Sequence, residues 1–290
     1  VLANAITEAP AGTTVVLSNG TYHIADEIVI DKAITVTSYG NGVYGGLANA
    51  TNTVIDGPAN LGSSGPRIFS VTHAGAVLDG LTITDGYGRK MAPDGGVGVY
   101  MSAGLLRNCI IKENGTFNGN TDHADGGGVY MTGGVVSNCT IQANQIGYGT
   151  TTGAGIYAAG GEITHCRVLD NETRGSAGGG GIYAANGSVA IRNCLIARNS
   201  TYANGGGIYL NGGIIESCTI VTNAAGTDGS GTGGGIYRAN GTVSNSIVYF
   251  NTGTGGTEQD DLNATGTWLG YSCASDAGSA TNGNITADPL

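Results

Sequence analysis

Two segments of the chain are rich in side chains that can perform acid–base chemistry. They supply Arg89, Lys90, Asp94, Asp122, His123 and Asp125. Elimination from an acidic sugar needs a cation to neutralise the carboxylate and a base for the adjacent C–H, and Arg89, Lys90 and His123 could take these parts. Hydrolysis of a glycosidic bond needs two carboxylates at a set separation, for which Asp122 and Asp125 are candidates.

The carboxylates of these segments are also candidates for a calcium site. Asp94, Asp122 and Asp125 offer the oxygen ligands that Ca²⁺ prefers, and no other cofactor is expected. The alternative is that all of these side chains are solvated loop charges. A second acidic group lies near the C-terminus, where a solvated loop is expected rather than a calcium site: Glu258, Asp260 and Asp261.

A third candidate site is a series of six tyrosines, at steps of 30, 27, 26, 26 and 28 residues. They are Tyr100, Tyr130, Tyr157, Tyr183, Tyr209 and Tyr237. The preceding residue is always Val or Ile, and if that residue points inward, alternation sends the tyrosine outward. Flat aromatic faces suit sugar rings, so the outward stack would bind a glycan. One alternative is that the outward tyrosines only stabilise a sheet by stacking. The other is that the alternation is reversed, so that the tyrosines are buried.

The residues around each tyrosine also recur, at nearly constant distances from it. A Gly stands four residues before each tyrosine, and a Cys stands nine residues after it in four of the six copies. Five residues after the Cys position comes an Asn in every copy: Asn114, Asn144, Asn171, Asn199, Asn223 and Asn251. Aliphatic residues lie three before and two after the Cys position. The period is too short for a propeller blade, and helical stripes are absent.

Each copy therefore predicts three short β segments separated by Gly and Asn turns. Copies stacked in register form a parallel β-helix, an all-β solenoid, for which we expect about ten coils. Residues 1–290 would form a single domain, with an N-terminal cap over 1–12, coils over 13–251 and irregular C-terminal coils over 252–290. A short helix over residues 2–9 would cap the open end of the solenoid.

Five of the six cysteines occupy one position of the repeat: Cys109, Cys139, Cys166, Cys194 and Cys218. Metal sites need ligands two to four residues apart, and that spacing is absent. We expect a stack of buried thiols, with one disulfide between adjacent coils as the alternative. Cys273 lies outside the repeat and is expected to be a lone thiol.

Composition narrows the classes of partner. The net charge is −10, and the 11 basic residues are scattered, so nucleic acid is not expected to bind. No apolar run approaches 18 residues, so no membrane span is expected. The chain begins at Val1, and we interpret it as a trimmed or mature segment.

The repeat resembles known proteins. The coil is similar to the right-handed parallel β-helix of the pectate-lyase-like superfamily, because a two-residue turn before Cys carries Asn in four of six copies. The Gly-Gly-x-Ile-Tyr phrase resembles repeats of polymorphic outer-membrane proteins and of large bacterial surface proteins. The resemblance implies a right-handed coil and a secreted or cell-surface location in a bacterium. It does not imply an activity, since this fold hosts lyases, hydrolases, epimerases and adhesins.

We therefore expect a structural or adhesive module rather than an enzyme. Its partners would be extracellular glycans or other surface proteins, and its ends could stack on other copies. The alternative is a polysaccharide lyase or glycoside hydrolase acting on an acidic polysaccharide near Arg89 and His123. Regular coils favour the module, whereas the eleven-residue segment 115–125 favours the enzyme.

Overall fold

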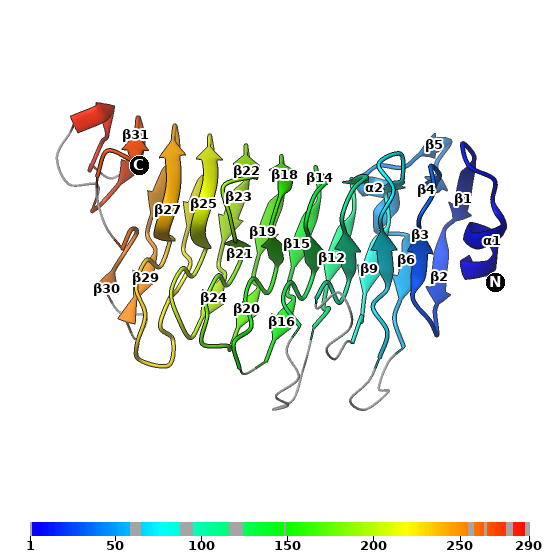
Figure 1. Ribbon diagram of the computed structural model, residues 1–290, viewed down its shortest axis with the longest axis horizontal. Coiled ribbons are helices and arrows are strands. Elements are labelled where there is room, and N and C mark those ends of the chain that lie inside the picture. Colours follow the sequence, from blue (N-terminus) through cyan, green and yellow to red (C-terminus); the bar gives the residue numbers. More distant parts are fainter. Residues whose placement is uncertain are drawn as a thin grey trace.

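The computed structural model describes residues 2–58, 65–87, 95–115, 124–147, 149–254, 258–263, 266–276 and 281–287. The strands stack along one long axis, with the N-terminal helix at one end and the last strands at the other (Figure 1). Nearly all pairings between strands are parallel and join one turn to the next. The chain is a parallel β-solenoid, which confirms the all-β fold predicted from the repeat.

The strands form three columns along the axis. The first column holds β3 (Ile28–Ile30), β7 (Phe69–Val71), β10 (Val99–Met101), β13 (Val129–Met131), β17 (Ile156–Ala158), β21 (Ile182–Ala184) and the first parts of β25 (Ile208–Glu216) and β27 (Ile236–Ser244). The second holds β1 (Thr14–Ser18), β4 (Thr35–Gly40), β8 (Val77–Asp79), β11 (Leu105–Arg107), β14 (Val135–Ser137), β18 (Gly161–Thr164), β22 (Val189–Arg192), the later parts of β25 and β27, and β31 (Leu269–Gly270). The third holds β2 (Gly20–His23), β6 (Thr53–Asp56), β9 (Thr82–Thr84), β12 (Ile110–Lys112), β15 (Thr140–Gln142), β19 (Arg167–Leu169), β23 (Leu195–Ala197), β26 (Thr219–Val221), β28 (Ile247–Tyr249) and β32 (Cys273–Ala274).

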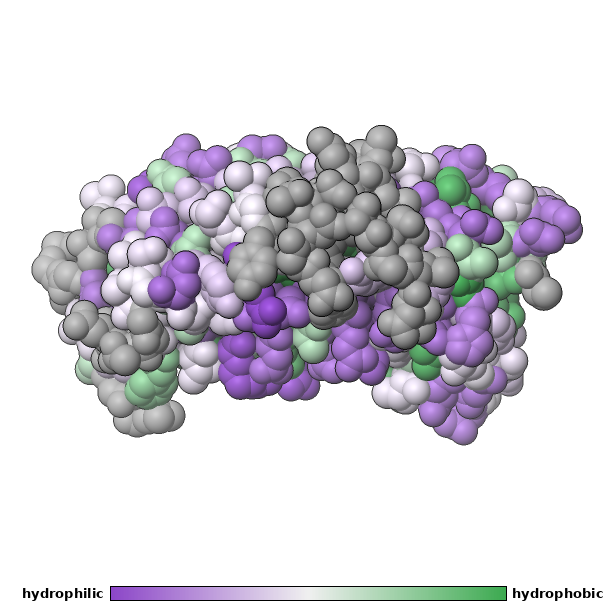
Figure 2. Space-filling view, turned by 90° about the horizontal axis from the view of Figure 1, so that it is seen from below, coloured by the Kyte–Doolittle hydropathy of each residue, from purple (hydrophilic) through white to green (hydrophobic). Residues whose placement is uncertain are grey.

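Several shorter strands and helices lie outside the three columns. A parallel three-stranded sheet comes after the third column along the chain, and it contains β16 (Gln145–Ile146), β20 (Glu172–Thr173) and β24 (Ser200–Thr201). These strands lie on the lower side of the solenoid in Figure 1, and the described residues on that face are mostly hydrophilic or intermediate in hydropathy (Figure 2). Two antiparallel pairs join β5 (Val43–Tyr44) to β4, and β29 (Thr252–Gly253) to β30 (Glu258–Gln259). The helical segments are α1 (Leu2–Glu8), α2 (Leu47–Ala50) and the 3₁₀ turn η2 (Thr281–Gly283).

The solenoid has about seven regular turns, fewer than the ten expected. The regular turns run from β7 to β28. The first turn has α1 in place of a first-column strand, and α1 packs against β3 with Leu2 and Ile6 buried. The second turn is interrupted by β5 and α2, and the last turn has no first-column strand among the described residues. The six copies of the repeated phrase therefore correspond to all but the first of the regular turns.

Aliphatic side chains from the three columns fill the interior. In the second and third columns, the inward positions fall at the predicted places on either side of the Cys position. The third-column set is Ile83, Ile111, Ile141, Val168, Ile196, Ile220 and Val248, all fully buried. Burial of a Val or Ile side chain stabilises a fold by about 1.5–3 kcal/mol, so these columns supply the main driving force for stacking.

Corners with a left-handed backbone turn the chain from one column to the next. Between the second and third columns this conformation belongs to Asn108, Asn138, His165, Asn193, Ser217 and Asn245, with φ between 49° and 55°. Asn tolerates this region better than most residues, because its short side chain can hydrogen-bond locally. His165 and Ser217 occupy the same corner, as the alignment of the repeats predicts.

The six asparagines Asn114, Asn144, Asn171, Asn199, Asn223 and Asn251, which we call the asparagine ladder, form a hydrogen-bonded row inside the solenoid. Each is at most 1% exposed. The Nδ2 of each donates to the Oδ1 of the next, as between Asn171 and Asn199 at 2.9 Å, and to a third-column carbonyl. These hydrogen bonds connect the corner of each regular turn to the turns on either side of it.

Asp261 ends this row, which corrects the prediction of a solvated acidic loop. Its side chain is fully buried, and its Oδ1 accepts from the backbone N and the Nδ2 of Asn251, both at 2.9 Å. Its Oδ2 accepts from the backbone N and the Oγ of Ser275. Asp261 therefore joins the C-terminal segment to the asparagine ladder.

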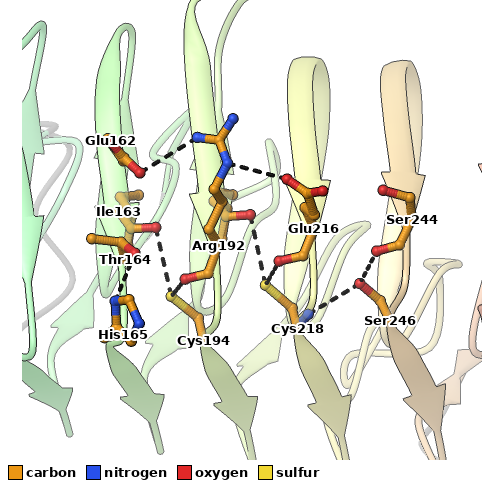
Figure 3. Close-up of polar contacts among 11 residues, drawn as sticks. Glu162, Ile163, Thr164, His165, Arg192, Cys194, Glu216, Cys218, Ser244 and Ser246 are labelled. Carbon is orange, nitrogen blue, oxygen red and sulfur yellow. Dashed lines mark hydrogen bonds and ion pairs between the residues drawn. The ribbon is translucent and has the colours of Figure 1, made fainter.

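The five cysteines of the repeat, which we call the cysteine stack, are buried free thiols, as predicted. Each thiol lies near a main-chain carbonyl of the preceding turn, as for Cys194 and Ile163 at 3.7 Å (Figure 3). Ser246 continues the row, and its Oγ accepts from the backbone N of Cys218 at 3.1 Å. Cys273 is half-buried and lies outside the stack.

Candidate functional site

The six tyrosines of the repeat, which we call the tyrosine ladder, form one stacked row on the first column. Parallel pairing aligns each tyrosine with the tyrosine of the next turn. Consecutive ring centroids are 5.9, 4.5, 5.6, 4.8 and 4.8 Å apart, with interplanar angles of 26°, 12°, 4°, 21° and 31°. Such distances place neighbouring rings in contact.

The tyrosines point outward, as predicted from alternation. The residues on either side of Tyr157, Ile156 and Ala158, are fully buried, whereas Tyr157 itself is half-buried. The same pattern holds on every first-column strand from β10 to β25. The ladder therefore presents an aromatic stripe to solvent while the flanking residues fill the core.

The environment keeps the central tyrosines protonated. Burial, the neighbouring Tyr130 and the Asp125 carboxylate raise the pKa of Tyr157 to about 12. Burial and Tyr209 raise the pKa of Tyr183 in the same direction. Tyr157 and Tyr183 are therefore neutral phenols at physiological pH, able both to stack and to donate hydrogen bonds.

A buried cation ends the ladder at its N-terminal side. The guanidinium of Arg67 lies 4.9 Å from the centroid of the Tyr100 ring, and the side chain is only 1% exposed. Arg67 pairs with Glu27 at 3.6 Å. Burial lowers the pKa of Arg67, while Glu27 opposes this effect. The cation–π contact fixes the first ring of the row.

A cleft of about 610 Å³ lies among the loops that lead into the ladder strands. Its lining includes Arg174, Ser176, Tyr202, Asn204, Asp228 and Ser230. Asn204 directly precedes Gly205, where the next ladder strand begins its approach to Tyr209. Gly178 lies against both Asn204 and the ring of Tyr209, since a methyl group added to Gly178 would come within 3.1 Å of that ring. The cleft and the ladder are therefore adjacent.

Main-chain hydrogen bonds hold the loops of this cleft in place. The N–H of Ser176 donates to Gly149 at 2.7 Å, and the N–H of Gly226 donates to Ala203 at 2.9 Å. The side chain of Asn204 accepts from the N–H of Thr232 at 2.9 Å. Successive loops thus stack on one another like the strands below them, and the cleft exists before a ligand arrives.

The charges of the cleft do not favour an anionic ligand. Arg174 pairs with Glu172 through two hydrogen bonds of 3.0 Å, so its positive charge is largely neutralised. Asp228 adds a negative charge. The mixture of an aromatic ring, an amide, hydroxyls and a carboxylate suits a neutral polyhydroxylated ligand.

Most of the predicted acid–base residues lie outside the described residues. These are Arg89, Lys90, Asp94, Asp122 and His123. Asp125 is described, and its Oδ1 accepts from the backbone N and the Oγ1 of Thr152, at 2.7 and 2.8 Å. This carboxylate joins one loop to the next turn. The convergence of these residues, and the calcium site, stay predictions; the described part of the chain holds no group of three metal-ligating side chains.

Charged side chains on the second column form ion pairs along the axis. Arg192 lies between Glu162 and Glu216 on the neighbouring strands, at 3.4 and 3.2 Å (Figure 3). Arg107 pairs with Asp79 in the same way, at 2.8 Å. The pairs of Arg192 are partly exposed, so each contributes little to stability on its own, whereas the carboxylate of Asp79 is buried.

Sequence reasoning missed the cleft and found the tyrosine ladder. The residues of the cleft come from loop segments that share no repeated phrase, so their proximity follows only from how the loops stack. Their one available signal was the short length of four consecutive loop segments, 8, 7, 5 and 9 residues, which keeps them close to the strands.

The fold and this site define a parallel β-solenoid repeat protein with an aromatic outer face. No family model, curated protein or solved structure matches the chain. Among the described residues, the helices are too short to span a membrane.

Proposed function

We propose that the protein is a structural and adhesive module of a secreted or cell-surface bacterial protein, and that it binds neutral glycans along the tyrosine ladder. The observation that carries this proposal is the row of six outward, half-buried, stacked phenols. The solvent-exposed edges of the stacked rings form a continuous aromatic stripe against which the apolar face of a sugar ring can pack, while the phenol hydroxyls donate to sugar oxygens.

The loop cleft supports the same ligand class. It lies beside the ladder, is held by main-chain hydrogen bonds, and offers hydroxyl, amide and carboxylate groups. A chain lying along the ladder could place an end or a branch in the cleft. The net charge of −10 and the neutralised Arg174 oppose an acidic polysaccharide, so we propose neutral sugars.

A glycan array tests this function. We expect the wild-type protein to bind neutral glycans, and the double variant Y157A/Y183A to bind at least about tenfold more weakly, which corresponds to roughly 1.4 kcal/mol. Y157F/Y183F keeps the rings and should retain most of the affinity. Y44A is the matched control, because Tyr44 is 64% exposed and lies outside the ladder.

Four other outcomes would point to a different or an additional role. A silent array would leave only the structural role. Release of unsaturated uronates from an acidic polysaccharide would establish the lyase alternative, and release of reducing ends without unsaturation would establish the hydrolase. Concentration-dependent sedimentation would show end-to-end association, in which a surface protein or a second copy is the partner.

A further inference from the structure

The tyrosine ladder holds pairs of identical oxidisable rings in contact within one molecule. Tyr130 and Tyr157 are the closest pair, at 4.5 Å and 12°. Tyr157 and Tyr183 are 5.6 Å apart and nearly parallel, at 4°. Because pairing in register fixes these contacts, every ladder ring except the first and last has a phenol on both sides.

Phenols in this arrangement are prone to one specific oxidation. Removal of an electron and a proton from a phenol leaves a phenoxyl radical with spin on the ring carbons next to the oxygen. Two such radicals on neighbouring rings join through these carbons, and transfer of the hydrogen on each joined carbon to the oxygen of its own ring restores both phenols. The two electrons and two protons convert one hydrogen peroxide into two waters.

Proximity makes the bond within one molecule faster than a bond between molecules. A partner held in contact has an effective concentration far above that of a second protein in solution. The ladder rings are also half-buried, so their edges reach solvent while their faces stay stacked.

We propose that the tyrosine ladder is an oxidative cross-linking site, at which a haem peroxidase and hydrogen peroxide join tyrosines of adjacent turns as dityrosine. Each bond links one turn covalently to the next along the axis of the solenoid. This modification does not depend on glycan binding.

Tryptic peptide mapping tests the proposal on the purified protein, treated with peroxidase and peroxide at low concentration. Cleavage after the basic residues separates Tyr183, in peptide 175–192, from Tyr157, in peptide 113–167, and from Tyr209, in peptide 199–238. We expect the monomer to lose two hydrogen atoms for each bond, to gain dityrosine fluorescence, and to yield peptide 175–192 joined to each of the other two.

Single ring substitutions supply the controls. Y183F keeps the stacked ring but removes the phenol, so both joined species should disappear. Y209F should remove only the joint with peptide 199–238, which also contains Tyr202. Y39F/Y44F should leave both joints unchanged, although that exposed pair lies at 4.8 Å. Joined peptides that persist in Y183F, bonds formed only between molecules, or a wild-type mass without hydrogen loss would overturn the proposal.

Discussion

Replacement of Asn171 by Ala removes one rung from the middle of the asparagine ladder. The Nδ2 of Asn171 donates to the carbonyl of Ile141 at 3.0 Å and to the Oδ1 of Asn199 at 2.9 Å. Its Oδ1 accepts from the backbone N and the Nδ2 of Asn144, at 3.0 and 2.9 Å. The variant therefore loses four hydrogen bonds at a site that is fully buried.

The cost follows from which partners are left without a bond. The Oδ1 of Asn199 keeps the backbone N–H of residue 171, and the Nδ2 of Asn144 keeps the carbonyl of Ile111. The backbone N–H of Asn144 loses the bond that Asn171 made to it, whereas the carbonyl of Ile141 stays within the parallel pairing of β15 and β19. A buried polar group left without a partner costs about 1–3 kcal/mol, so we expect a loss of at least about this size in the free energy of unfolding.

Urea unfolding followed by circular dichroism measures this loss. Amide hydrogen exchange at Asn144 measures the local opening, because turns of a solenoid contact only their neighbours. Asn138→Gly is the matched control: Asn138 lies on an exposed corner with φ of 49°, which Gly adopts freely, so its loss should stay within roughly 1 kcal/mol. If Asn171→Ala costs no more than this control, the asparagine ladder does not hold the turns together.

Two further predictions concern the thiols and the C-terminal segment. The thiols of the cysteine stack are at most 3% exposed, so a thiol reagent should label only Cys273 until urea exposes all six cysteines. Hydrogen bonding to Cys166 and burial also raise the pKa of Cys194 to about 12, whereas hydrogen bonds from its two neighbours lower the pKa of Cys166, so burial and not the pKa protects the stack. Fast labelling of the stack in the native protein would contradict this. Burial raises the pKa of Asp276 to about 6, above its unfolded value of roughly 3.9, so the folded state binds the proton more tightly and stability falls as pH rises between these values. At pH values above the folded pKa of about 6, Asp276→Asn should therefore raise the melting temperature, whereas at pH values below the unfolded pKa of roughly 3.9 it should leave the melting temperature unchanged. An equal shift in melting temperature at both pH values would refute the assignment.

The regular turns were predictable because each repeated position has one physical role. Val or Ile before each tyrosine favoured an outward tyrosine, and the structure, in which the residues on either side of Tyr157 are buried, decides between this and the reversed alternation. A constant Asn five residues after the Cys position pointed to a stacked amide row. The sequence likewise indicated a capping helix, which the structure places at Leu2–Glu8.

The features that interrupt the repeat could not be predicted in the same way. The β5–α2 insertion and the cleft depend on contacts between segments with no common phrase. Asp261 takes the place of an asparagine at the end of the ladder, but it comes ten residues after Asn251 instead of one full turn later. Its carboxylate therefore looked like a loop charge, although its oxygens complete the buried hydrogen bonds.

The most direct test of the proposed function is saturation-transfer NMR between the aromatic protons of the protein and the neutral oligosaccharide that binds best on the array. If the tyrosine ladder is the binding face, transfer to the sugar occurs in the wild type, in Y157F/Y183F and in Y44A, and is lost in Y157A/Y183A. Equal transfer and affinity in Y157A/Y183A and the wild type would show that the sugar binds elsewhere, and that the tyrosine ladder only stabilises the sheet.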